Sequence, residues 1–193
     1  MENSKVIWID VETTGLSAKK DQIIELAALY EDGIDENKSK FHIFCKPPQK
    51  TDNWDFISDL TGITWEFLEE NGVDEKTMYQ KFKQWINQRV DSFNSFDKAI
   101  FAAYNAGFDN RFMRALFEKN SDKYFGSYFE SANLDILATV AMARKNGILP
   151  QLKNNKQDTV ANHLGIQFKA HSAIEDIKAG RQVQLILEKK MKR

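Results

Sequence analysis

Three apolar runs rich in β-branched and aromatic residues follow one another near the start of the chain, and they limit its fold more than any other feature. They predict strands over residues 5–11, 22–30 and 39–46, because such residues fit the pleated, half-buried surface of a sheet. The second run is also compatible with a helix from Glu25 onward, since Ala-Ala-Leu is a good helix segment; we predict a strand. The polar, glycine-containing segment 31–38 is the expected hairpin connection.

After Pro47 and Pro48, apolar residues recur at helical spacing. This spacing predicts helices over residues 54–60, 64–71 and 75–90, from about Gly107 onward, and over 134–146, 156–164 and 173–191. A further apolar strand is predicted over residues 98–104. Early strands, a strand after a helix and a helical C-terminal half together indicate an α/β domain with a mixed sheet.

The length and the lack of linkers predict a single domain. The chain has 193 residues without a Pro- or Gly-rich linker. Cys45 is the only cysteine, so an intramolecular disulfide is excluded, and we expect this side chain to fill the core. The start MENSKVIWID lacks the features of a signal peptide, and no apolar stretch approaches the roughly 18 residues that span a membrane. We therefore expect a cytoplasmic protein without membrane contact.

The charge balance limits how the chain can bind nucleic acid. It carries 27 basic and 28 acidic side chains, for a formal net charge of −1. Such a balance provides no general attraction to a polyanion, which argues against tight non-specific wrapping of long duplex and allows a small site that grips one chain end. The basic run at residues 188–193 is expected to be a solvated helix end, where cations suit the helix dipole.

Two acids at the end of the first predicted strand are candidate metal ligands. Asp10 and Glu12 are two residues apart, which puts both side chains on one face of a strand. Adjacent carboxylates repel each other unless a cation lies between them, and hard ions such as Mg²⁺ take oxygen ligands. A pair of solvated acids at a strand end is the alternative. The Thr13-Thr14-Gly15-Leu16 segment that follows favours a ligand site, because hydroxyls and a glycine permit close contact with a phosphate or a sugar.

Two more acidic segments lie later in the chain. Asp109 follows Tyr104-Asn105-Ala106-Gly107-Phe108 and is expected in the first turn of a helix, where an acid also suits the helix dipole. His171 is expected in the loop before the last helix, Ser172 as its cap, and Asp176 inside it. The other histidines, His42 and His163, are expected to be structural.

Three segments together resemble the motifs of a known nuclease family. VIWIDVETTGL, AYNAGFDNRFM and HSAIEDIKAG are similar to the three exonuclease motifs of the DEDDh, or DnaQ-like, family, and Asp59–Thr64 is similar to the segment ahead of the second motif. The resemblance extends from about residue 5 to 185. It implies a ribonuclease H-like fold with a mixed sheet of about five strands flanked by helices. The family includes the proofreading exonuclease subunit of bacterial replicative DNA polymerase.

The resemblance also implies a role for each motif residue. Two divalent ions, Mg²⁺ or Mn²⁺, would be bound by Asp10, Glu12, Asp109 and Asp176, and His171 would be the general base, since its position five residues before Asp176 matches the histidine branch. Thr13, Thr14, Leu16, Asn105 and Phe108 would hold the terminal nucleotide. Tyr104 departs from the histidine that many members have before the asparagine, which affects the expected substrate contacts and not the chemistry.

These roles agree with what phosphodiester hydrolysis requires. The substrate is anionic, so the site must neutralise charge and supply a nucleophile near neutral pH, and two metal ions do both. We therefore predict a 3′→5′ exonuclease that acts on a single-stranded 3′ end and releases nucleoside monophosphates, DNA being favoured over RNA, with a DNA polymerase as a candidate partner. The alternatives are an oligoribonuclease-like enzyme for very short RNA and a non-catalytic nucleic-acid-binding module.

Overall fold

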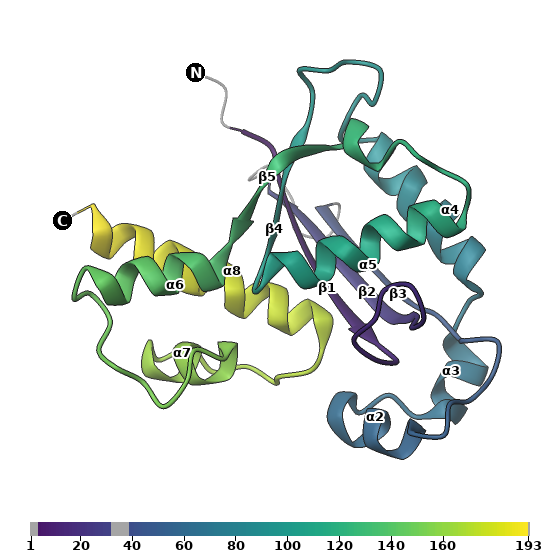
Figure 1. Cartoon of the computed structure of the whole chain (residues 1–193), viewed down its shortest axis with the longest axis horizontal. Helices are drawn as coiled ribbons and strands as arrows, with labels where there is room; N and C mark the ends of the chain where they lie inside the picture. The colour runs from purple at the N-terminus through teal and green to yellow at the C-terminus, as the bar shows by residue number, and fades with distance from the viewer. Residues whose placement is uncertain (1–3, 32–38, 193) are drawn as a thin grey trace.

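A mixed sheet forms the centre of the protein (Figure 1). The computed structural model describes residues 4–31 and 39–192, and in this part of the chain the sheet has five strands in the order β3-β2-β1-β4-β5. Pairing is antiparallel for β1–β2 and β2–β3 and parallel for β1–β4 and β4–β5. The strands are β1 Val6–Thr13, β2 Ile23–Glu31, β3 Lys40–Phe44, β4 Ala99–Ala103 and β5 Phe129–Asp135. The predicted α/β class with about five strands is confirmed.

Helices cover both faces of this sheet. The first face packs on α4 and α5, and the other packs on α6, α7 and α8, which gather on the left in Figure 1. The alternation of side chains along β1 serves both layers, because Ile7, Ile9 and Val11 enter the first core and Trp8 enters the second. The helices are α2 Trp54–Thr61, α3 Trp65–Asn71, α4 Glu75–Asn87, α5 Ala106–Lys119, α6 Ile136–Lys145, α7 Gln157–His163 and α8 Ala173–Met191, with a 3₁₀ turn, η1, at Phe125–Ser127.

The fifth strand is the main difference from the sequence-based elements. Residues 134–146 were expected to be helical, but α6 begins at Ile136 and β5 precedes it. The strand FESANLD lies at the edge of the sheet, and its four residues after Phe129 are exposed. It therefore lacks the apolar alternation by which half-buried strands are recognised.

The other elements agree with their predictions to within a few residues. The run at residues 22–30 is a strand and not a helix, and the helix predicted over 75–90 ends at Asn87. Cys45 is buried as expected, and burial raises the pKa of its thiol to about 12. The predicted hairpin connection at 31–38 lies, after Glu31, outside the described residues. Within the described ranges, the model contains no helix both long enough and apolar enough to cross a membrane.

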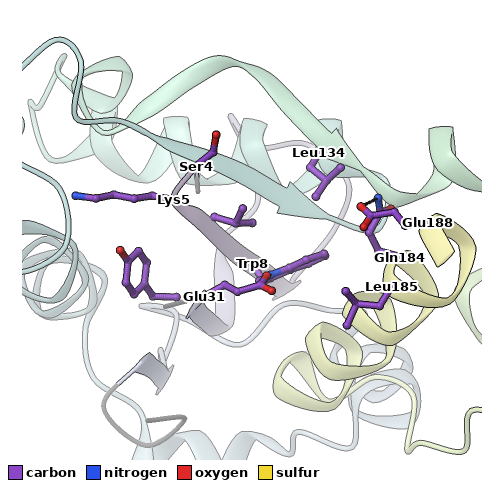
Figure 2. Close-up of a pocket in the computed structure, with 10 residues that line it drawn as sticks. Ser4, Lys5, Trp8, Glu31, Leu134, Gln184, Leu185 and Glu188 are labelled. Carbon is purple, nitrogen blue, oxygen red and sulfur yellow. Dashed lines mark hydrogen bonds between the residues drawn. The ribbon is translucent and has the colours of Figure 1, made fainter. Parts of the chain in front are cut away.

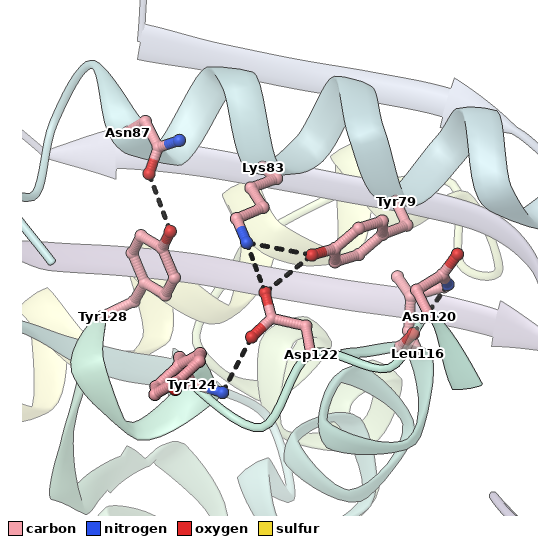
Figure 3. Close-up of polar contacts among 8 residues, drawn as sticks. All are labelled: Tyr79, Lys83, Asn87, Leu116, Asn120, Asp122, Tyr124 and Tyr128. Carbon is pink, nitrogen blue, oxygen red and sulfur yellow. Dashed lines mark hydrogen bonds and ion pairs between the residues drawn. The ribbon is translucent and has the colours of Figure 1, made fainter. Parts of the chain in front are cut away.

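A buried polar network ties α4 to the segment after α5 (Figure 3). The carboxylate of Asp122 accepts hydrogen bonds from the Tyr79 hydroxyl at 2.6 Å, from the Lys83 ammonium and from the Tyr124 backbone N–H at 2.8 Å. Asp122 is only 6% exposed, so it depends on these partners in place of water.

Candidate active site

Three carboxylates from the two ends of the chain converge beside β1. Among the described residues, one oxygen each of Asp10, Glu12 and Asp176 lies within 4.8 Å of the other two. Asp10 and Glu12 share the face of β1 that α8 covers, and Asp176 lies in the first turn of α8. Hard divalent cations bind such oxygen ligands, so this group fits a metal ion by its donor chemistry.

Asp109 lies next to β1 from the opposite layer, outside the three acids whose oxygens are within 4.8 Å of one another. The β1–β4 pairing runs from Val6–Ile100 to Trp8–Ala102. Farther along β1, the backbone N–H of Val11 donates to Oδ1 of Asp109 at 3.2 Å. Asp109 is 3% exposed and lies in the first turn of α5, whose start follows β4 directly. The site thus lies at the carboxyl ends of parallel strands, where α/β sheets commonly bind ligands.

The four carboxyl groups have raised pKa values because they are desolvated and close together. The pKa of Glu12 is raised to about 8, first by desolvation and then by the charges of Asp176 and Glu25. Desolvation raises the pKa of Asp109 to about 8 and that of Asp176 to about 6. Asp10 has a pKa well above its ordinary range, owing first to desolvation and then to Asp109 and Asp176. A cation bound among them would relieve this repulsion.

The loop after β1 is shaped by its own hydrogen bonds. The Thr13 hydroxyl donates to the Gly15 carbonyl at 2.7 Å, and the hydroxyl of buried Thr14 accepts from the Gln22 N–H at 3.0 Å. A Cβ on Gly15 would lie 2.5 Å from the Asp21 carboxylate, so a larger residue here would displace the Asp21 side chain. Leu16, by contrast, is 84% exposed.

The start of α5 holds the second group of expected substrate contacts. Asn105 has a left-handed backbone (φ 64°), and its N–H donates to Asp135 at 3.2 Å. Phe108 is half-buried, with its ring 4.9 Å from that of Phe112. The Tyr104 hydroxyl donates to the Asn155 carbonyl at 2.6 Å, so this departure from the family pattern makes a contact within the protein.

His171 lies in the expected loop immediately before α8. It is exposed and has a left-handed backbone (φ 64°). The expected capping by the Ser172 side chain was wrong: no side-chain cap bond forms, and the Ser172 N–H instead donates to the Asp176 carboxylate at 3.1 Å. Backbone N–H groups of His171 and Ser172 lower the pKa of Asp176 against the effect of desolvation.

Two charged residues near the site were not identified from the sequence. Glu25 on β2 is 2% exposed and raises the pKa values of the carboxyl groups of Asp10, Glu12 and Asp176. Arg111 lowers the pKa of Asp109. A charge inside the buried apolar run IIELAALY was a usable signal for Glu25, because buried acids are rare without a partner.

Known proteins resemble this chain along nearly its whole length. The family model RNase_T, described as an exonuclease, matches residues 7–183. The chain belongs to this exonuclease family. This confirms the predicted DnaQ-like membership and places the chain among the nuclease hydrolases. It is similar to DNA polymerase III PolC-type of Thermotoga petrophila, at 32% identity over 100% of the chain and 12% of the relative. The PolC-type enzyme of Bacillus cereus is 34% identical over 92% of the chain and 11% of the relative.

The exonuclease thus spans about one eighth of the length of these relatives. Among solved structures, a product-bound exonuclease I superposes with a TM-score of 0.77 at 20% identity, covering 100% of this chain and 45% of that one. The zinc-bound complex of Escherichia coli exonuclease I with single-stranded DNA gives a TM-score of 0.75 at 20% identity, over 100% and 41%. These likenesses confirm the ribonuclease H-like fold.

Proposed function

We propose that residues 1–193 form one exonuclease domain that removes nucleoside monophosphates from the 3′ end of single-stranded nucleic acid, preferably DNA. The observation that carries this proposal is the convergence of Asp10, Glu12 and Asp176 within 4.8 Å, with Asp109 bonded to the adjoining backbone. A cluster of carboxylates with raised pKa values is costly for a fold, which favours a catalytic over a merely structural or binding role.

Each residue of the site has a part in this hydrolysis. Asp10, Glu12, Asp109 and Asp176 would hold two Mg²⁺ or Mn²⁺ ions, which supply charge neutralisation at the phosphate and activation of water. His171 would take the proton from the attacking water, since histidine titrates near the working pH. Its exposed position beside the first turn of α8 leaves it accessible to solvent and substrate.

The remaining motif residues would hold the terminal nucleotide. Exposed Leu16 offers an apolar surface to a base, and half-buried Phe108 a second one. Thr13 and Asn105 would bond sugar and phosphate groups. The hydroxyl of Thr14 accepts a bond from the Gln22 N–H, which fixes the loop and leaves its own proton for a bond to the nucleotide.

A digestion experiment tests the proposal. Strands labelled at the 5′ end are incubated with Mg²⁺, Mn²⁺ or chelator, as single-stranded DNA, duplex DNA, RNA and dinucleotides. We expect a ladder that shortens from the 3′ end of single-stranded DNA and disappears in chelator. Cleavage confined to dinucleotides and very short RNA would support the oligoribonuclease-like alternative, and unchanged cleavage in chelator would exclude the metal mechanism.

We further propose a DNA polymerase as partner, because the PolC-type relatives are polymerases that contain a matching segment. Co-elution of the exonuclease with a replicative polymerase in gel filtration is the expected result. Separate elution at micromolar concentrations of both proteins would contradict it.

A further inference from the structure

A fifth carboxylate faces the site from the neighbouring strand. Glu25 on β2 is the direct cross-strand partner of Glu12 on β1, so both side chains project from the same face of the sheet. Asp10 pairs with Ala27 in the same register and shares that face. Glu25 is 2% exposed, yet it lies in a strand whose other early residues are apolar and buried.

His42 holds this carboxylate from the third strand. Its Nε2–H donates to Oε1 of Glu25 at 2.6 Å. The cross-strand partner of His42 is Ala27, which places the histidine on the same face. The His42 ring lies 4.9 Å from the Phe44 ring, which in turn meets the Phe67 ring of α3 at 4.8 Å. The histidine is therefore fixed on two sides.

Glu12, Glu25 and His42 thus form a polar row across three adjacent strands. The row begins among the carboxylates of the candidate metal site and ends on the edge strand β3. The Glu25 carboxylate interacts electrostatically with the other acids, since it contributes to the raised pKa values of Glu12 and Asp176. A buried negative charge on the strand next to the site strengthens the binding of a divalent cation by Coulomb attraction, because little solvent screens it.

We propose that Glu25 is a positioning residue that strengthens divalent-cation binding at Asp10 and Glu12, and that His42 acts through Glu25 by holding its carboxylate in place. This inference rests on the proposed function, because it needs a metal site. It changes the expected role of His42, which is structural in the sequence-based assignment, and gives the histidine an effect on the metal.

Isothermal titration of the metal-free full chain with Mn²⁺ and Mg²⁺ tests this without any activity assay. Glu25→Gln keeps the shape and removes the charge, and it should weaken cation affinity about tenfold or more. His42→Ala should weaken it in the same direction, and Glu25→Gln/His42→Ala should be no weaker than Glu25→Gln alone. His42→Gln retains an N–H donor and should restore most of the affinity. His163→Ala, which alters a histidine on α7, is the matched control and should bind as the wild type does.

The outcomes separate the two proposals. If the wild-type chain binds neither ion, the proposed function fails. If it binds them and folded His42→Ala and Glu25→Gln bind equally well, the positioning role is overturned. Additive losses in the double variant would show that His42 does not act through Glu25. Should Glu25→Gln not fold, the comparison of His42→Ala with His42→Gln decides, because a purely structural histidine would lower the melting temperature and leave the affinity unchanged.

Discussion

The carboxyl groups of Asp10, Glu12 and Asp109 are desolvated and close to other acids, which costs the metal-free protein stability. Replacing one of them should therefore have opposite effects on activity and on the stability of the metal-free protein. We predict that Asp10→Asn lowers the rate of 3′-end removal by at least about 10²-fold, since it removes a proposed metal ligand. In chelator its melting temperature should rise, because the cost of desolvating an ionisable carboxyl group among other acids is gone.

Single-turnover digestion and thermal unfolding of the same samples measure both effects. Asp158→Asn, which changes an exposed acid in the first turn of α7, is the control and should change neither by much. A near-wild-type rate for Asp10→Asn would place the active site elsewhere.

His171 allows a test of the general base. We predict that His171→Ala lowers turnover by about 10²–10⁴-fold while metal affinity, measured by titration, stays close to that of the wild type. The rising acid limb of the pH–rate profile should be altered in the variant. Full activity with the same limb would show that His171 is a loop residue without a catalytic role.

The candidate metal ligands are the residues that local sequence best predicts. Short segments with a recognisable residue pattern contain all four acids, and the structure brings these acids to one end of the sheet: Asp10, Glu12, Asp109 and Asp176. Glu25 was not identified because its relation to the site depends on strand register, which no short segment contains. Arg111 lies two residues after Asp109 in the same segment, and the sequence analysis did not use its effect on that acid. The Ser172 side chain makes no cap bond although the interaction beside it is local, since the Ser172 N–H donates to the carboxylate of Asp176 four residues later.

The spacing of apolar residues predicted the helices and the buried strands, whereas it did not predict the edge strand β5. β2 and β4 have apolar residues that alternate or run together, because two layers of helices cover them. β5 pairs with one strand only and is exposed to solvent on its other edge. Its extended conformation is therefore set by the pairing with β4, and the pattern of its own side chains does not reveal it. Its C-terminal residue, Asp135, still has a clear local role, because its carboxylate caps α6 at Leu137.

The network around Asp122 should make a measurable contribution to the packing of α4 (Figure 3). Asp122→Ala leaves the Tyr79 hydroxyl and the Tyr124 N–H without their acceptor and Lys83 without its ion-pair partner. We predict a loss of about 2–4 kcal/mol in the free energy of unfolding, measured with urea. Lys83→Met should cost less, because the lysine is partly exposed and the tyrosine bond survives. Equal, small losses would mean that water replaces the network.

Across the full chain, the site should dominate how stability depends on pH. Unfolded acids ionise near pH 4, whereas Glu12 and Asp109 have pKa values of about 8 and Asp176 of about 6 in the native protein. The native state therefore binds more protons between these limits, and its stability falls as pH rises from about 4 to about 8. The lowered pKa values of Asp74, Asp97 and Asp122 act in the opposite sense, but they change the stability only below about pH 5.

We predict that the melting temperature of the metal-free protein falls between pH 5 and 9, and that millimolar Mg²⁺ reduces this fall. Scanning calorimetry across this range, with and without chelator, gives both curves. A melting temperature that does not change with pH in chelator would show that the native fold does not raise the pKa values of these carboxyl groups.

The order of the four acids along the chain affects when the candidate site can form during synthesis. Asp10 is made well before Asp176, which lies on the helix that packs against β1 and β2. A ribosome delivers the chain from its N-terminus, so the sheet emerges well before α8 does. While it is being translated beside its own messenger RNA, the nascent nuclease lacks one wall of its site. The order of the acids thus delays the proposed cleaving activity until α8 has emerged.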